Sequence, residues 1–246
     1  MADWSDLDDQ RMKALVVTGE DRPGFGVVWP NVLWTAQLFW QARTAGDHDR
    51  RIETWHHLVM AVGNFKRQGG TQICLLRASA EDGIWSDHYA RPDLCKVQTL
   101  TGEVELRRDA PDTWKLLTSD KECVKGVDVA TATTLLSALW PGTHVIIDLR
   151  DLRASIGLNL AEAVTGRGVN TDNRRDVEVS WDWYEWMRTK IVSKAVELRT
   201  EPLTVERALY WLDRRVKRPR KGEPKQSWTE YAEALGGVLL ELEPSS

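Results

Sequence analysis

Ionisable side chains around the segment at residues 144–149 are the first candidates for chemistry. This segment reads HVIIDL and is the most strand-like in the chain, with His144 at its start, Asp148 near its end and Asp151 just beyond. Enzymes with open α/β sheets often place acids where strands end. The three side chains are therefore a candidate non-contiguous active site. Ion pairs of the aspartates with neighbouring arginines explain the same pattern, and we favour them because no GxSxG or nucleophile–base motif is present. We assign no catalytic residue.

Metal and cofactor chemistry finds little support. His56 and His57 are adjacent, so on a helix they point about 100° apart and would not face one metal ion. The loops Gly24–Gly26 and Gly166–Gly168 match neither a P-loop nor a GxGxxG fingerprint. We therefore expect no metal and no cofactor. Three cysteines at wide spacing favour free buried thiols over a disulfide framework.

A run of cations near the C-terminus suggests a different chemistry, the binding of phosphates. It consists of Arg214, Arg215, Lys217, Arg218, Arg220, Lys221 and Lys225. Trp211 and Trp228 flank this basic run and could stack on bases. A solvated helix end, where cations complement the helix dipole, explains the same residues. We favour the solvated end because the net charge of the chain is −4, and keep nucleic-acid binding as an alternative function.

Tryptophan is over-represented among the aromatic residues. The chain has thirteen tryptophans against three phenylalanines and four tyrosines, and Trp181, Trp183, Tyr184 and Trp186 lie within six positions. On a helix these rings point to nearly all sides, so one stripe does not bury them all in a single core. A contact between two parts of the same chain would account for this. The alternative is an interface with a partner, which makes Trp181, Trp183 and Trp186 candidate partner-binding residues.

Composition narrows the class of protein. The chain has 246 residues, 42% hydrophobic and 28% charged, as in ordinary globular proteins. No run approaches the ~18 consecutive apolar residues of a membrane span, so we expect no membrane partner. The N-terminus is acidic and lacks the basic start of a secretory signal, which favours the cytoplasm.

Helices are expected at both ends of the chain. Spacing predicts helices over about 31–44 and from Asp47 to about Gln68, which together form a helical hairpin. Further helices are expected after Ser180, from Pro202, and after the capping box Ser227 to Glu230, the last interrupted by a glycine pair. Residues 1–10 are expected to be a disordered acidic leader.

Strands are expected in between. The candidates are Met12–Thr18, Gln72–Leu76, Lys96–Leu100, Glu103–Arg107, Trp114–Thr118, His144–Leu149 and a short one near Ser155–Leu158. A helix capped by Asp128 precedes the 144–149 segment. Residues 169–179 are polar and without periodicity, and we expect a linker or surface loop there.

Part of the middle region resembles a known family. The order from Asp112 to about Leu160 is a strand ending at Thr118–Ser119, an acidic turn, a helix, Pro141–Gly142 and the strand that starts at His144. This is similar to the N-terminal domain of the SseB family, a small α+β module of bacterial accessory proteins. The segment after Asp148 lacks the family's usual Asn-Pro step. The resemblance brings no catalytic residues and implies an accessory or interaction role.

Together these patterns predict an α+β protein. A helical hairpin packs on a mostly antiparallel sheet of about five strands within residues 11–168, and a helical subdomain follows at 180–246. The leading functional hypothesis is a non-catalytic bacterial accessory or interaction protein, such as an adaptor, an immunity-type protein or an assembly subunit. Its partner would be another protein or a second copy of the chain. Nucleic-acid binding through the basic run and an enzyme with a site near Asp148 are the alternatives.

Overall fold

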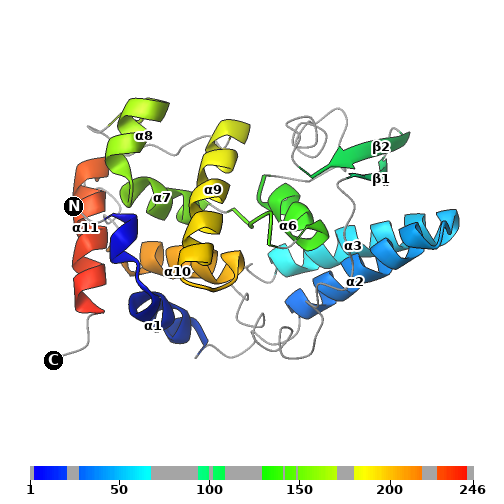
Figure 1. Cartoon of the computed structure of the whole chain (residues 1–246), viewed down its shortest axis with the longest axis horizontal. Coiled ribbons are helices and arrows are strands. Elements are labelled where there is room, and N and C mark those ends of the chain that lie inside the picture. The colour runs from blue at the N-terminus through cyan, green and yellow to red at the C-terminus, as the bar shows by residue number, and fades with distance from the viewer. Residues whose placement is uncertain are drawn as a thin grey trace. The chain divides into compact units, whose positions relative to one another are not determined.

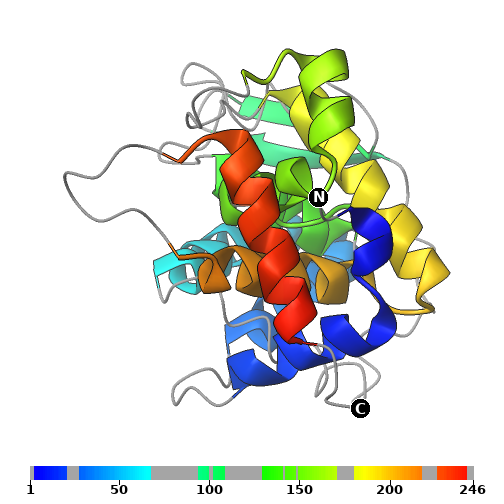
Figure 2. The same cartoon turned by 90° about the vertical axis from the view of Figure 1, so that its left-hand side faces the viewer.

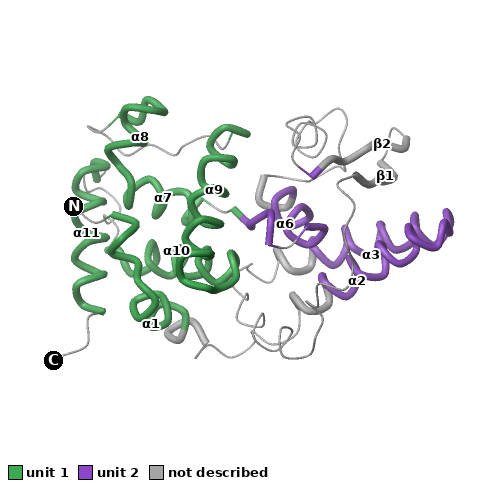
Figure 3. The backbone as a smooth tube through the Cα atoms, in the orientation of Figure 1, with its two compact units in different colours: residues 1–21, 147–246 green, residues 22–146 purple. Residues whose placement is uncertain are grey.

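A computed structural model describes most of the chain. It covers residues 3–20, 28–67, 94–99, 102–108, 129–140, 142–147, 149–170, 180–217 and 226–242. The chain divides into two compact units (Figure 3). Unit 1 combines residues 1–21 with 147–246, and unit 2 is the intervening segment, residues 22–146. Each unit is described by itself.

The predicted α+β fold with a five-stranded sheet is wrong. The described residues form nine α-helices, one 3₁₀ helix and a single pair of strands. The error came from short apolar runs, which were predicted as strands. A run of four to eight buried residues fits a central strand and a buried helix or loop equally well.

Three of the predicted strands show this directly. Residues 12–18 lie inside helix α1 (Asp9–Glu20), and the segment near 155–158 ends helix α7 (Leu149–Gly157). In the 144–149 segment, His144 makes one bridge, residues 145–147 form no strand, and Leu149 already begins α7. Val145, Ile146 and Ile147 are nevertheless all buried. Their apolar run therefore reports burial and not β-structure.

Unit 2 contains the helical hairpin that the spacing predicts. Helix α2 (Val28–Thr44) packs along α3 (His48–Arg67), and α6 (Val129–Leu139) contacts both (Figure 1). Strands β1 (Leu94–Thr99) and β2 (Gly102–Arg107) pair in antiparallel fashion, with Thr99 opposite Gly102. The segments 72–76 and 114–118 lie outside the described residues.

Indole rings fill the core of unit 2. Phe39, Trp40, Trp55 and Trp140 are all buried, and their ring centroids lie 5.5 to 6.0 Å apart in a chain of tilted and edge-to-face contacts. The indole Nε1 of Trp40 donates a hydrogen bond to the carbonyl oxygen of Leu139 at 3.1 Å. Tryptophan suits this position because it provides a large apolar surface while its one polar atom reaches a partner.

Unit 1 is a bundle of six helices among the described residues. With α1 and α7 it comprises α8 (Leu160–Arg167), α9 (Trp181–Glu197), α10 (Pro202–Arg215) and α11 (Trp228–Glu241). Helix α10 lies among α1, α7 and α9, and α11 crosses it (Figures 1 and 2). The apolar face of α10 is buried and includes Leu203, Val205, Ala208, Leu209 and Leu212.

Local signals start these helices where the sequence indicates. The Ser180 side chain accepts from the Trp183 backbone N–H, Pro202 occupies the first turn of α10, and Ser227 forms a reciprocal capping box with Glu230. Each arrangement satisfies or removes backbone donors that the first turn of a helix leaves without partners. The predicted interruption at Gly236–Gly237 is absent, since α11 runs on to Glu241.

Residues 3–10, expected as part of a disordered leader, form helical structure and its connections. Asp3 caps the 3₁₀ helix η1 (Trp4–Asp6), and its side chain accepts from the backbone N–H of Ser5 at 2.6 Å. Leu7 is fully buried, which explains why an acidic segment docks. The guanidinium of Arg207 on α10 donates to the carbonyl oxygen of Val16 at 3.1 Å and ties α1 to the bundle.

A buried carboxylate links three helices of unit 1. Asp213 on α10 is 1% exposed and accepts a hydrogen bond from the Tyr231 hydroxyl of α11 at 2.7 Å. Its other oxygen lies 3.5 Å from the Arg150 guanidinium of α7, which also covers the ring of Tyr210. A buried charge is tolerated only when it is paired in this way.

Gly157, at the end of α7, is in close contact with α11. A Cβ atom there would lie 2.3 Å from Leu235 Cδ1 and 3.0 Å from Tyr231 Cε1, and both of these residues are fully buried. Only glycine fits without a shift of its neighbours.

Candidate functional site

The four aromatic rings at the start of α9 divide between the core and the surface. Tyr184 is fully buried and Trp186 is 6% exposed, whereas Trp181 and Trp183 keep part of their surface in solvent. The rings of Trp183 and Trp186 meet nearly perpendicular, with centroids 5.4 Å apart. The i, i+3 spacing of these two tryptophans places both on one face of the helix, as the geometry of an α-helix requires.

An arginine from the neighbouring helix covers both indoles. The guanidinium of Arg167 lies 5.5 Å from the ring centroid of Trp183 and 5.7 Å from that of Trp186. Arg167 is the last residue of α8, and Gly168 ends the helix with a φ of 68° in the left-handed region that glycine tolerates. We call Arg167, Trp183 and Trp186 the Arg167 platform.

A carboxylate orients one indole of this platform. Glu162 of α8 accepts hydrogen bonds from Trp186 Nε1 and from Lys190 Nζ, each at 2.7 Å, and a third from Asn159 Nδ2 at 2.5 Å. The indole of Trp186 therefore has a fixed orientation. The ammonium of Lys190 is the largest cause that lowers the pKa of Glu162, from its ordinary 4.5 to about 2, and the Trp186 indole is the next.

This shift predicts how stability depends on pH. Because the folded pKa of Glu162 is depressed, its contribution is complete above the unfolded value of 4.5 and is lost as pH falls toward about 2. We expect Glu162→Gln to be less stable than the parent protein at neutral pH, and this difference to shrink across that window. Urea denaturation of both proteins at a series of pH values measures it. A difference that stays constant from neutral pH to pH 3 would contradict the assigned pKa.

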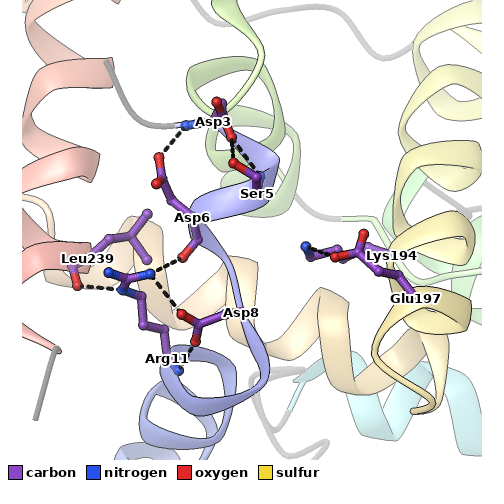
Figure 4. Close-up of polar contacts among 8 residues, drawn as sticks. All are labelled: Asp3, Ser5, Asp6, Asp8, Arg11, Lys194, Glu197 and Leu239. Carbon is purple, nitrogen blue, oxygen red and sulfur yellow. Dashed lines mark hydrogen bonds and ion pairs between the residues drawn. The ribbon is translucent and has the colours of Figure 1, made fainter.

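Glu162 and Lys190 also line a cavity of about 380 Å³. The other lining residues are Asp3, Trp4, Asn159, Ser193, Lys194 and Glu197. Lys194 is 4% exposed, and its Nζ atom lies 2.7 Å from Glu197 Oε1 (Figure 4). Three carboxylates and two ammonium groups surround this space, so it offers no net attraction to an anion.

A second cavity, of about 460 Å³, lies between the N-terminal segment and α11. Its lining consists of Asp6, Arg11, Glu233, Gly236, Gly237, Leu239 and Leu240. The guanidinium of Arg11 donates there to the Leu239 carbonyl at 3.1 Å, the Asp6 carbonyl at 3.0 Å and the Asp8 carboxylate at 2.8 Å (Figure 4). These bonds fix the N-terminal segment to the bundle.

The tryptophans that flank the basic run are buried, and Trp211 contacts the start of the run, since the Arg214 guanidinium lies 5.3 Å from its ring centroid. Arg214, Arg215 and Lys217 are exposed at the end of α10, and the remaining members, Arg218, Arg220, Lys221 and Lys225, lie outside the described residues. Trp211 is 6% exposed and Trp228 1% exposed. Both occupy the buried faces of their helices, so neither ring is available to stack on a base.

The acids near residue 148 do not assemble into a site that the structure describes. Asp148 lies outside the described residues. Asp151 is 2% exposed within α7, and His144 is fully buried with Nε2 hydrogen-bonded to the carbonyl oxygen of Arg108. His144 and Asp151 belong to different compact units, and both cavities above are lined by other residues.

Sequence reasoning found Trp183 and Trp186 but missed the residues that complete the site. Glu162 and Arg167 come from α8, some twenty residues earlier, and only the fold brings them to α9. The only indication in the sequence was the spacing of Trp183 and Trp186. It predicts that another segment packs against this face of the helix, but it does not identify that segment.

Comparison of the chain with protein-family models, curated proteins and solved structures gives no significant match. Within the described ranges, no group of three or more His, Cys, Asp or Glu side chains is placed to hold a metal ion. Over that same part of the chain, no helix has both the length and the apolarity needed to cross a membrane.

Proposed function

We propose that this chain is a non-catalytic interaction protein that binds a partner protein through the Arg167 platform. The observation that carries the proposal is the exposed guanidinium of Arg167 resting on two indoles, with part of Trp183 open to solvent beside it. Arginine and tryptophan are the residue types that most often dominate binding energy in protein interfaces.

The rigidity of the platform supports this role. The indole of Trp186 donates a hydrogen bond to Glu162, and Glu162 is held in turn by hydrogen bonds from Lys190 and Asn159. A preorganised surface loses little side-chain entropy when a partner docks, so more of the contact energy appears as affinity. Exposed Trp and Arg side chains without a binding role would not need hydrogen bonds that fix their orientation.

Photocrosslinking from Gly166 tests the proposal. A Cβ atom at Gly166 meets no atom within 4 Å, so a benzoylphenylalanine fits there beside Arg167 without disturbing the fold. We expect irradiation in extract of the source cells to yield one discrete crosslinked protein, and Arg167→Glu in the same chain to abolish it. The same probe at Val196, 74% exposed near the other end of α9, is the matched control and should give no such product.

A crosslink to a second copy of the chain would identify the partner as itself, and light scattering would then show the dimer. Crosslinks that are equal from both positions, or unchanged by Arg167→Glu, would contradict the proposal. A strictly monomeric protein with no specific crosslink from Gly166 would do so as well.

A further inference from the structure

We infer that the Arg167 platform recognises an acidic segment of its partner, in which a carboxylate side chain stands next to a large apolar one. This inference rests on the proposed function and adds the chemistry of the partner. The carboxylate would bind the guanidinium edge of Arg167, and the apolar side chain would cover the solvent-facing part of Trp183.

The guanidinium N–H groups of Arg167 are available to donate hydrogen bonds to a partner. The structure gives it two ring contacts but no hydrogen bond or ion pair to any residue that it describes. Ring contacts at these distances use none of its N–H groups as hydrogen-bond donors, and the fork geometry of a guanidinium matches a carboxylate bidentately. Arg188, only a few residues along α9, shows the contrast, because its Nη2 is already 2.8 Å from Glu185 Oε1.

Local charge also favours an anionic group at this point. Glu162 lies 2.7 Å from Lys190, so this pair is neutral, and Arg167 adds a positive charge at the end of α8 that makes no ion pair with any residue that the structure describes. The attraction is short in range, since two acidic residues flank Trp183 in the sequence of α9: Asp182, which is exposed, and Glu185, which pairs with Arg188. A single carboxylate fits this pattern, whereas the repeated phosphates of a nucleic acid would meet these acids.

The apolar half of the recognition comes from Trp183. Its ring is partly exposed and meets Trp186 edge to face at 87°, so it presents a flat surface of fixed orientation. An aliphatic or aromatic side chain on this surface would shield the charge pair from water and strengthen it.

Selection from a phage-displayed library of random peptides tests the inference with the full chain as bait. We expect the selected peptides to share an Asp or Glu adjacent to a large apolar residue. A labelled synthetic copy of one of them should bind about tenfold to a hundredfold more weakly to Arg167→Gln than to the parent chain. Arg188→Gln, whose arginine is already paired, is the matched control and should bind as the parent does.

A double-mutant cycle assigns the contact. Replacing the peptide carboxylate by its amide should weaken binding to the parent chain by the same factor, and should cause no further loss in Arg167→Gln. Selected peptides without a carboxylate, or peptides that bind Arg167→Gln equally well, would overturn the inference. So would binding of a single-stranded DNA oligonucleotide that Arg167→Gln removes. If no peptide is selected while Gly166 still crosslinks a protein, the acidic segment is wrong and the proposed function survives.

Discussion

Replacing Asp213 by alanine is expected to lower the free energy of unfolding by about 3–5 kcal/mol. The substitution removes the acceptor of the Tyr231 hydroxyl, whose hydrogen bond is 2.7 Å long, and leaves the Arg150 guanidinium without the carboxylate at 3.5 Å. The largest part of this cost arises because Tyr231 is fully buried, so its hydroxyl is left without an acceptor away from water. Equilibrium urea denaturation followed by helical circular dichroism measures the loss.

Two further variants show that burial is the cause. Tyr231→Phe keeps the ring and deletes one donor to Asp213, so its cost should be smaller, about 1–3 kcal/mol. Asp182→Ala removes an exposed aspartate from the first turn of α9 and should change stability by roughly 1 kcal/mol or less. If Asp213→Ala were as mild as Asp182→Ala, the carboxylate would not hold α7, α10 and α11 together.

Gly157→Ala and Gly237→Ala are expected to shift stability in opposite directions. At Gly157 the new methyl group would lie 2.3 Å from Leu235 Cδ1 inside a packed core, and overpacking of this kind costs about 1–3 kcal/mol. At Gly237, inside α11, no atom lies within 4 Å of the new Cβ and the backbone φ is not positive. Alanine there should stabilise the protein by about 0.5–1 kcal/mol, because glycine loses more backbone freedom in a helix.

The pair is its own control, since both changes add one methyl group to a helical glycine of unit 1. Thermal denaturation of the two variants beside the parent chain shows the sign of each effect. Two shifts of the same sign would mean that the contact between α7 and α11 at Gly157 is looser than described.

Local chemistry made the C-terminal helices predictable. The Ser227–Glu230 capping box and the proline at Pro202 act within a single turn, so a single sequence displays them in full. The strand predicted at 144–149 failed because burial of Val145 and Ile147 comes from tertiary packing, which an apolar run reveals without specifying the backbone.

Only the two tryptophans of the candidate site could be predicted from the sequence. Trp183 and Trp186 are one turn apart, so their shared face follows from helix geometry alone. Arg167 and Glu162 belong to α8, and their contacts with α9 depend on how two helices pack. The same limit explains Trp211 and Trp228, which looked available for stacking beside a basic run until packing placed both in the core.

The discontinuity of unit 1 sets an order of events during synthesis. Helix α1 leaves the ribosome before unit 2, but α10, which carries the Arg207 that bonds to Val16, follows almost two hundred residues later. Until then α1, whose apolar face carries Met12 and Leu15, lacks the helix against which it packs, while every segment of unit 2 has already emerged. Unit 2 can therefore fold before the bundle of unit 1. Meanwhile the apolar face of α1 stays exposed on the nascent chain, and we expect chaperones to bind it until α10 has been translated.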